Sequence, residues 1–237
     1  MPEALFRKFE RFHAFTESEK EMLIDSIERV EKIGKGRDII SEGRNPEHVH
    51  LLLEGWACRY QLLDSGKQHI MAFLIPGDLC DVHVTLLDYM DHSIRAVSPA
   101  KVAYIPTRQI KEILGCHQRI ANALFWAMLV DEAILRQWLV NLGSRSAVQR
   151  IAHLICEMRV RSSVAGICKE NTFTFPLTQE ELGEAMGLTQ VHTNRSLRKL
   201  RDEGLIRRDR YELEICDWAR LQQIAGFRDE YLHLKAR

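Results

Sequence analysis

Short apolar runs separated by turn residues fill the first half of the chain, from about Glu31 to Pro106. Glycine, proline, asparagine and aspartate interrupt these runs at close intervals, as at Pro76-Gly77 and Ser98-Pro99. Many short strands at regular spacing predict an antiparallel barrel or roll. A short capped helix is expected before them, beginning at Thr16. The six strands that we expect cover residues 38–41, 49–54, 56–62, 69–74, 93–96 and 101–105.

A helical period follows and predicts one long helix, which begins at Thr107 or Gln118 and ends near Leu142. Seven of its residues recur at spacings of three and four, and six of the seven are apolar, as in a coiled-coil seam. We expect this seam to face a second copy of the chain. The alternative is a helix buried within one chain, because apolar residues occupy nearly all of its sides. The predicted seam consists of Ala121, Leu124, Met128, Asp131, Leu135, Trp138 and Leu142.

Asp131 is the polar member of this seam. A carboxylate buried alone would be costly, so we expect Asp131 to fix the register of the helix or to meet a cation. Residues 141–144, with the sequence Asn-Leu-Gly-Ser, are the expected hinge to a second domain.

Residues 177–200 carry the most specific pattern in the chain, two short helices joined by a tight turn. Thr178 and Glu181 have the spacing of a capping box for the first helix, and Thr189 is suited to cap the second. Gly187 falls where the turn requires a positive φ angle. Gly183 lies within the first helix, where glycine costs about 1 kcal/mol relative to alanine. We therefore expect a close approach of the two helices at Gly183.

The second helix of this pair separates its residues into two faces. Thr193, Leu197 and Leu200 share one side and are suited to a core. The other side holds polar residues such as Asn194 and Arg195. Arginine pairs bidentately with guanine in the major groove, and asparagine or glutamine pairs with adenine. The pattern predicts a helix-turn-helix that recognises DNA; the alternative is an ordinary helix pair with a basic exposed face.

The residues that follow strengthen the DNA prediction. Gly204 is the expected helix cap, and residues 205–213 have the pattern of a short hairpin, the wing of a winged helix. Residues 190–210 hold seven Lys or Arg against three Asp or Glu, while the whole chain has a formal net charge of +0. The basic charge is therefore local, as a phosphate-binding patch requires. The residues expected to contact DNA are Thr178, Thr189, Gln190, Val191, His192, Asn194, Arg195, Arg198, Lys199, Arg207 and Arg208.

The length and composition of the chain limit the classes of protein to which it can belong. A length of 237 residues suits two modest domains, and 46% hydrophobic with 28% charged residues is ordinary for a soluble protein. Neither a membrane span nor a secretory signal is expected. The 6 cysteines are scattered, which favours reduced thiols in the cytoplasm over disulfides. The spacing predicts no zinc site. The enzyme motifs that we sought, a P-loop, a Gly-x-Ser-x-Gly elbow and a His-Glu-x-x-His, are absent, so we expect no enzyme.

The order of roll, long helix, hinge and winged helix resembles the bacterial family of the cyclic-AMP receptor protein and the fumarate–nitrate reduction regulator, the Crp–Fnr family. The resemblance covers nearly the whole chain, and its most specific parts are the helix-turn-helix, GRDIISEGRNPEHVHLLLEGWACRY and PGDL. It implies an α+β fold with an N-terminal antiparallel β-roll of the cyclic-nucleotide-binding type, a long dimerisation helix and a C-terminal winged helix-turn-helix. It also implies a bacterial transcription regulator whose partners are double-stranded DNA, a second copy of the chain and RNA polymerase. The expected divisions are residues 1–116, 117–143 and 144–237.

The chain departs from the family pattern where relatives bind cyclic AMP. By comparison with those relatives, Val82 takes the place of the ribose-binding Glu, and His92 that of the phosphate-binding Arg. Histidine cannot form the bidentate pair of an arginine with phosphate, and Asp81 would add negative charge beside an anion. We therefore expect no tight cyclic-AMP binding. The candidate effector pocket consists of Gly77, Asp78, Asp81, Val82, His83, His92 and Ser93.

Other cofactors of the family have little support in the sequence. The iron–sulfur members carry an N-terminal cysteine cluster, whereas Cys58 is the first cysteine of this chain. No haem and no metal site are expected, although His83, Met90 and His92 are residue types that ligate metals. Cys156 and Cys216 lie in the predicted DNA domain, where a buried inert thiol is the ordinary state.

The expected function is a homodimeric regulator of the Crp–Fnr type that binds a palindromic promoter site without cyclic AMP or an iron–sulfur cluster. Two alternatives stay open. The roll could hold a different small-molecule effector, or the chain could be a nucleotide-binding signalling scaffold that does not read DNA. Many relatives carry Glu at the position of Val191. Since valine can touch a thymine methyl group but cannot accept from cytosine, we expect a related but distinct palindrome.

Overall fold

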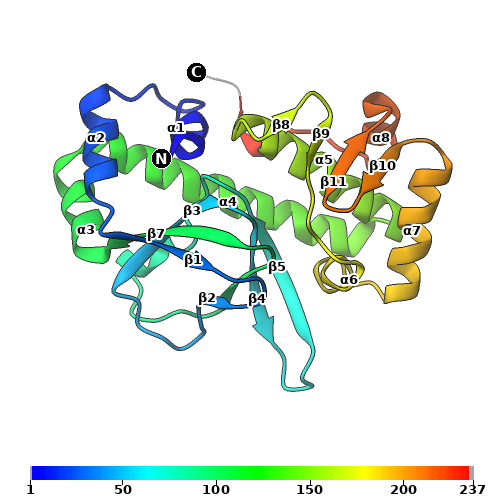
Figure 1. Cartoon of the computed structure of the whole chain (residues 1–237), viewed down its shortest axis with the longest axis horizontal. Coiled ribbons are helices and arrows are strands. Elements are labelled where there is room, and N and C mark those ends of the chain that lie inside the picture. Colours follow the sequence, from blue (N-terminus) through cyan, green and yellow to red (C-terminus); the bar gives the residue numbers. More distant parts are fainter. Residues whose placement is uncertain (1, 235–237) are drawn as a thin grey trace.

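A single 27-residue helix, α4 (Gln118–Ser144), joins the two lobes of the protein (Figure 1). The computed structural model describes residues 2–234. The first lobe contains α1 (Glu3–Phe9), α2 (Glu17–Asp25), β1 (Arg29–Ile33), β2 (Asp38–Ile40), β3 (His48–Glu54), β4 (Ala57–Leu62), β5 (Gln68–Leu74), the 3-10 helix η1 (Val82–Thr85), β6 (Ser93–Ala96), β7 (Ala100–Pro106) and α3 (Thr107–Cys116). The second lobe contains α5 (Ala147–Val164), β8 (Cys168–Lys169), β9 (Thr172–Thr174), α6 (Gln179–Met186), α7 (Gln190–Asp202), β10 (Ile206–Asp209), β11 (Glu212–Ile215), α8 (Trp218–Ala225) and the 3-10 helix η2 (Glu230–Leu232).

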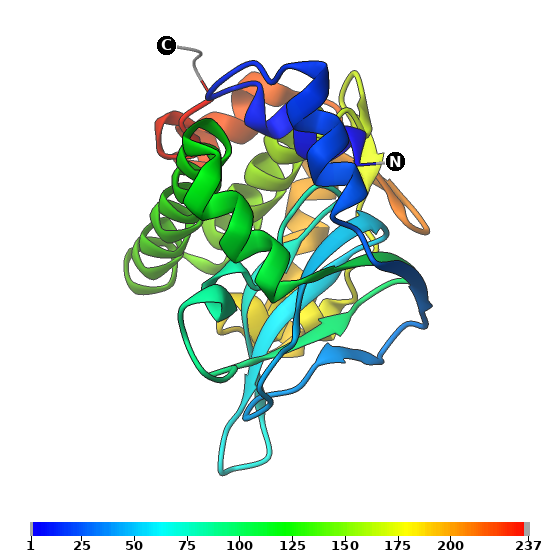
Figure 2. The same ribbon diagram turned by 90° about the vertical axis from the view of Figure 1, so that its left-hand side faces the viewer.

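The strands of the first lobe form two antiparallel sheets, ordered β1-β7-β3 and β2-β6-β4-β5. This arrangement confirms the predicted roll, and all six expected strands are present. Strand β1 was not predicted, because its sequence RVEKI carries three charged residues and most of its side chains are exposed. The long hairpin of β4 and β5 projects from the roll, as Figure 2 shows from the side.

The helical region between the lobes is divided at His117. Its backbone, with φ −124° and ψ 81°, ends α3 at Cys116 and starts α4 at Gln118, which was one of the two predicted starts. The predicted hinge at residues 141–144 is wrong, because α4 continues through it. The Asn141 side chain is buried and donates to the carbonyl oxygen of Arg150 at 3.3 Å, which holds this turn in place. The chain instead changes direction at Arg145, which is extended, before Ser146 caps α5.

The predicted seam of α4 is only partly correct. Leu124 and Trp138 are 2% and 3% exposed because they pack inside the chain, and the Trp138 indole nitrogen donates to Glu157 of α5 at 3.1 Å. These two residues therefore do not face a partner. A helix of 3.6 residues per turn drifts away from a strict seven-residue repeat, so Leu124 packs in the core of the first lobe and Trp138 in the core that includes α5. The exposed apolar face of α4 consists of Phe125, Met128, Leu129, Leu135, Leu139 and Val140.

Asp131 does meet a cation, and the cation belongs to the same chain. Its carboxylate forms an ion pair with Arg59 of β4. Arg59 also donates to the carbonyl oxygen of Cys80 through Nε at 3.1 Å and through Nη2 at 3.0 Å. This arginine therefore connects the roll, the segment after β5 and α4.

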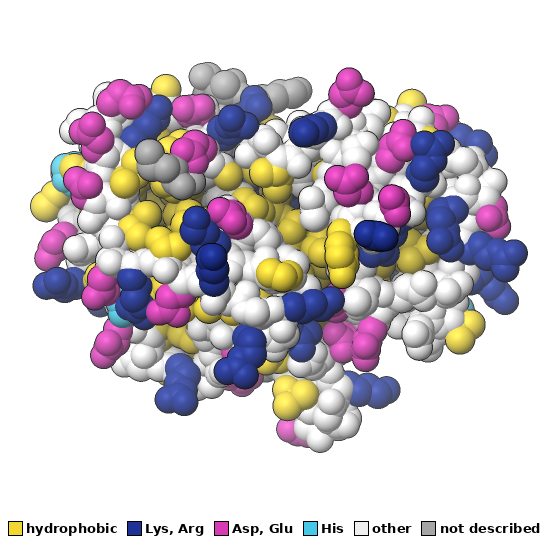
Figure 3. Space-filling model, in the orientation of Figure 1, with side chains coloured by type: hydrophobic (Ala, Val, Ile, Leu, Met, Phe, Trp, Pro, Cys, Tyr) yellow, Lys and Arg dark blue, Asp and Glu magenta, His cyan; other side chains and the backbone are white. Residues whose placement is uncertain are grey.

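The two lobes share a hydrophobic core instead of meeting only through α4. Trp56 of the roll packs edge-on against Phe175, with ring centroids 5.9 Å apart, and Phe73 of β5 packs against Trp138 at the same separation. Apolar side chains gather between the lobes in the space-filling view (Figure 3). A second core lies within the first lobe and joins the roll to α1, α2, α3 and the first half of α4. The second lobe is thus docked firmly on the roll in this structure.

The structure contains no membrane-spanning helix within residues 2–234, since none of its helices combines the length and the apolar character that a bilayer requires.

Candidate functional site

Helices α6 and α7 form the predicted helix-turn-helix, with each local signal in its expected place. The backbone nitrogen of Thr178 donates to Glu181 Oε2 at 2.7 Å, and the backbone nitrogen of Glu181 donates to Thr178 Oγ1 at 3.1 Å, which completes the capping box. Gly187 has φ +61°, in the left-handed region. Thr189 Oγ1 accepts from the backbone nitrogen of His192 at 3.3 Å and caps α7. These bonds fix the angle between the two helices.

The two faces of α7 separate as predicted. Thr193, Leu197 and Leu200 are buried against the lobe. The opposite face is open to solvent, and its side chains are Gln190, Val191, His192, Asn194, Arg195, Arg198 and Lys199. Val191 is 70% exposed, so its side chain is available to a ligand on this face. Lys and Arg side chains gather at the edge of the molecule where α7 lies (Figures 1 and 3).

The ion pairs on this face leave it free to bind an anion. Arg198 lies 3.5 Å from Asp202, and Lys199 lies 3.9 Å from Glu203; both basic side chains are exposed. Exposed pairs of this kind contribute little, on the order of 0.5 kcal/mol. The side chain of Arg195 is exposed and has neither a hydrogen bond nor an ion pair within residues 2–234. The face can therefore exchange its weak internal contacts for phosphates and base edges.

The predicted wing is present as the hairpin of β10 and β11, with Arg210 at its tip in the left-handed region. One residue of the wing that was expected to contact DNA, Arg208, is held within the chain. The Arg208 guanidinium turns inward and donates through Nη2 to the carbonyl oxygens of Leu177 at 2.6 Å and of Phe175 at 3.3 Å. Burial lowers its pKa from the usual value. Arg208 therefore ties the wing to the start of α6, while the neighbouring Arg207 stays exposed and pairs with Glu214.

Gly183 explains why the two helices can approach so closely. A Cβ atom at this position would lie 2.8 Å from the backbone carbonyl oxygen of Leu188, which cannot move without opening the turn. We expect Gly183→Ala to lower the free energy of unfolding by about 1–3 kcal/mol through overpacking. Urea denaturation measures this change.

Gly115 in α3 offers the matched control for this substitution. Its added Cβ would meet nothing within 4 Å. Gly115→Ala should therefore leave stability unchanged or raise it by about 0.5–1 kcal/mol, the difference in helix propensity. Equal effects of the two substitutions would contradict the close approach at Gly183.

A cavity of about 660 Å³ lies between the roll, α1, α4 and the second lobe. Five of the seven predicted pocket residues line it, namely Gly77, Asp78, Val82, His83 and His92. Sequence reasoning missed its other polar residues, which include Lys8, Arg59, Asp131 and Arg161. These residues come from four distant segments, and no local motif links them.

Two predicted pocket residues do not belong to the cavity lining. Asp81 is fully buried and turns toward His50, whose backbone nitrogen donates to Oδ1 at 2.7 Å and whose Nδ1 lies 2.5 Å from Oδ2. The expectation that Asp81 would repel a bound anion is therefore wrong. Ser93 is also buried, and its hydroxyl oxygen accepts from the backbone nitrogen of Glu42 at 2.9 Å.

Asp78 lines the cavity, but its carboxylate forms ion pairs with two cations of this chain. Lys8 Nζ lies 2.6 Å from its Oδ1, and Arg161 donates to its Oδ2 at 2.9 Å. Burial alone would raise the pKa of Asp78, but the two cations outweigh it and hold the pKa below its usual value. Arg161 also donates to Glu157 at 3.2 Å and to the carbonyl oxygen of Phe73 at 3.0 Å. A buried ionic network thus joins α1, the roll and α5.

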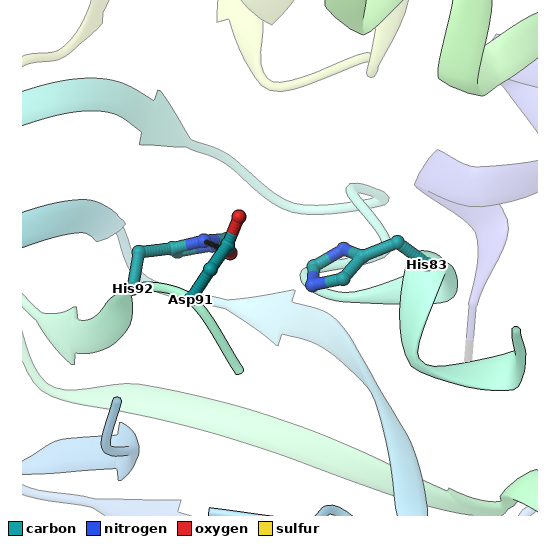
Figure 4. Close-up of side chains that lie close together, drawn as sticks. All are labelled: His83, Asp91 and His92. Carbon is teal, nitrogen blue, oxygen red and sulfur yellow. Dashed lines mark hydrogen bonds and ion pairs between the residues drawn. The ribbon is translucent and has the colours of Figure 1, made fainter. Parts of the chain in front are cut away.

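His83, Asp91 and His92 lie together at one end of the cavity (Figure 4). One donor atom of each residue lies within 4.8 Å of the others, and the His92 Nδ1 to Asp91 Oδ1 distance is 2.6 Å. Burial lowers the pKa of both histidines below the usual value. Met90, which was considered as a ligand with them, is fully buried in the roll core instead.

The cysteines fall into buried and exposed groups within the described residues. Cys58, Cys80 and Cys156 are buried. Burial raises the pKa of Cys58 to about 12 and that of Cys156 further, so neither is an effective nucleophile. Cys216, the other cysteine noted in the second domain, is exposed.

Two family models match separate segments that together cover more than half of the chain. Residues 149–224 match the Crp-like helix-turn-helix domain, and residues 30–116 match the cyclic nucleotide-binding domain. The transcriptional activator protein FnrL of Cereibacter sphaeroides is 23% identical over 214 residues, which cover 89% of this chain and 86% of the relative. The transcriptional activator protein Anr of Pseudomonas protegens is 24% identical over 209 residues, covering 86% and 84%.

Solved structures show the same fold. FixK2 from Bradyrhizobium japonicum superimposes with a TM-score of 0.76 at 20% sequence identity, covering 84% of this chain and 98% of that one. The similarity extends over the roll, α4 and the winged helix, so it concerns the whole architecture and not one lobe.

Proposed function

Because this chain belongs to the Crp–Fnr family of helix-turn-helix transcription regulators, we propose that it acts as a homodimer on a palindromic promoter site. The carrying observation is the solvent face of α7, where base-reading residue types stand beside exposed cations on a helix that Thr189 caps. A helix in this arrangement fits the major groove. We expect RNA polymerase as a further partner. The proposed function requires the chain to bind DNA and not to catalyse a reaction.

The exposed apolar face of α4 supports the dimer. A contiguous apolar surface on a soluble protein marks an interaction site. This surface runs along α4, the helix that joins the lobes. Two copies joined along α4 would carry two α7 helices, and a two-fold dimer reads a palindrome. For this function we divide the chain into a sensor roll (1–116), a dimer helix that the structure extends to Ser144, and a DNA-binding lobe from there on.

We propose that the regulator works without cyclic AMP and without an iron–sulfur cluster. Val82 and His92 stand where cyclic-AMP binders of the family place their Glu and Arg, and neither provides the missing contact. A second candidate is regulation by another small molecule in the roll. The observation that favours it is the cavity of about 660 Å³, a size that suits a small-molecule ligand.

Selection of binding sites from a random duplex pool tests the proposed function. The purified protein, without added effector, is incubated with the pool near physiological salt, and the retained DNA is sequenced. Recovery of a symmetric motif supports a dimeric regulator. Absence of any motif from a folded dimer contradicts effector-free action and favours an effector in the roll. If no motif is recovered with any of the small molecules tried, the result would favour the signalling scaffold.

Arg195 is the residue that we expect to read a guanine. Replacing it with alanine should weaken the selected site by about 1–3 kcal/mol and relax the preference at one base pair per half-site. Competition binding against single-base variants of the motif measures both effects. Lys169→Ala, an exposed substitution in β8 with the same change of charge, is the control and should leave the sequence preference unchanged. Uniform weakening on all sequences would make Arg195 a phosphate contact instead.

A further inference from the structure

The cluster of His83, Asp91 and His92 is a combination that the DNA-binding function does not use. His83 lies in η1, whereas Asp91 and His92 come directly before β6. The residues between them loop outward, and Leu86 and Tyr89 are exposed. The loop closes on itself and brings the His83 ring to face Asp91 and His92 (Figure 4). The cluster is therefore formed by tertiary structure and has no sequence motif.

Both imidazole rings carry an unsatisfied nitrogen. Nε2 of His83 and Nε2 of His92 are buried and have no hydrogen-bond partner within residues 2–234. A buried polar atom without a partner costs on the order of 1–3 kcal/mol, so two of them in one cluster require an explanation. The other nitrogen of His92, Nδ1, is held by Asp91 at 2.6 Å. A carboxylate on one imidazole nitrogen orients the ring and makes the other nitrogen a better ligand.

We propose that His83 and His92, the latter positioned by Asp91, bind a divalent transition-metal ion of the kind that prefers imidazole, such as Zn²⁺. Imidazole nitrogens are ligands that such ions prefer, and the coordination positions that the two histidines do not fill are left to water. Ligands on a tetrahedral Zn²⁺ ion lie about 3.3 Å apart, whereas the donor atoms here lie within 4.8 Å of one another. The bound ion therefore draws η1 toward β6.

This movement has a direct route to α4. His83 and His92 line the same cavity as Met128, Asp131 and Leu135 of α4. Arg59, which also lines it, is paired with Asp131. If the chain is the regulator proposed above, metal occupancy changes the packing beneath the helix that carries the exposed apolar face. The metal site itself does not depend on that function.

Metal binding is tested on the full chain after dialysis against a chelator. Zn²⁺ is titrated in competition with a chromophoric chelator, and Co²⁺ is titrated by its visible absorption, which reports the ligand geometry. We expect one ion per chain and a rise in the midpoint of thermal unfolding with added Zn²⁺. His83→Gln and His92→Gln should each weaken binding at least tenfold, and Asp91→Asn about tenfold. His69→Gln, in β5 of the same roll and outside the cluster, should leave the affinity unchanged.

The variants must be folded for the comparison to hold, and the metal-free unfolding midpoint checks this. Because neither Nε2 atom has a partner, we expect the midpoint without metal to stay close to that of the unmodified chain. The proposal is overturned if the unmodified chain binds no stoichiometric metal, or if His83→Gln binds it equally well. Neither result bears on the selection of DNA sites, so failure here and failure of the proposed function are distinguishable.

Discussion

Replacing Arg161 with methionine is expected to lower the free energy of unfolding by about 3–5 kcal/mol. Arg161 is buried and is shared by two carboxylates, Asp78 of the roll and Glu157 of its own helix. Methionine fills a similar volume but leaves Glu157 buried without its cation. Lys8 remains beside Asp78, so the loss of stability comes mainly from Glu157. Since a domain is stable by only about 5–15 kcal/mol, the loss is severe.

The pH dependence of this loss identifies its cause. Burial raises the pKa of Glu157 above its ordinary value of 4.5, and Arg161 opposes that effect. Without Arg161 the folded-state pKa rises further. A carboxyl group whose pKa is raised on folding contributes stability that is present below pH 4.5 and lost as pH rises through the folded pKa. The deficit of Arg161→Met should therefore be smallest in acid and grow as pH rises through the folded-state pKa of Glu157.

Urea denaturation at a fixed protein concentration measures both quantities, because a dimer's stability depends on concentration. Arg220→Met is the matched control. Arg220 is paired with Glu203 at 3.3 Å on the surface of α8 and is largely exposed, so its loss should cost no more than about 1 kcal/mol. A loss below that figure for Arg161→Met, or one that does not vary with pH, would contradict the role given to the buried network.

Placing charges on the exposed apolar face of α4 should separate the dimer. Phe125 and Leu139 are 61% and 65% exposed in the single chain and lie on that face. The double variant Phe125→Glu/Leu139→Glu puts four like charges into a two-fold interface. We expect a folded monomer whose affinity for the palindrome falls at least about 100-fold, or about 2.7 kcal/mol. Binding to an isolated half-site should change little.

Sedimentation analysis and competition binding measure these two outcomes. Lys111→Glu, an exposed substitution in α3, controls for the change in charge and should keep the dimer. Leu124→Glu distinguishes the exposed face from the seam expected from the sequence. Because Leu124 is buried inside the chain, that variant should unfold instead of dissociating. A double variant that remains dimeric would place the interface elsewhere.

The helix-turn-helix could be predicted from the sequence almost residue by residue. Its determinants are local: a capping threonine three residues before a glutamate, a glycine at a left-handed position, and a helix with one apolar side. Such signals act over one or two turns, so the order of residues contains them. Arg208 shows the limit of this reasoning. Its guanidinium turns toward the carbonyl oxygens of Phe175 and Leu177, more than thirty positions earlier, and only folding places them there.

The helix α4 was predicted as a helix, but two residues of its predicted seam are buried inside the chain. Periodicity shows which residues are apolar and cannot show what covers them. Packing within the first lobe buried Leu124, packing against α5 and the roll buried Trp138, and Phe125 and Leu139 were left exposed. Packing against α5 also moved the boundary between the lobes to Arg145, because Asn141 is held by α5.

The sequence by itself determined the architecture and the helix-turn-helix, since each depends on residue type at a local position. Only the tertiary structure decided which polar groups share the roll cavity. It turned Asp81 toward His50, bound Asp78 between Lys8 and Arg161, and brought His83 against Asp91 and His92. The physical reason is that a buried charge or imidazole must find its partners in space, and those partners come from segments far apart in the chain.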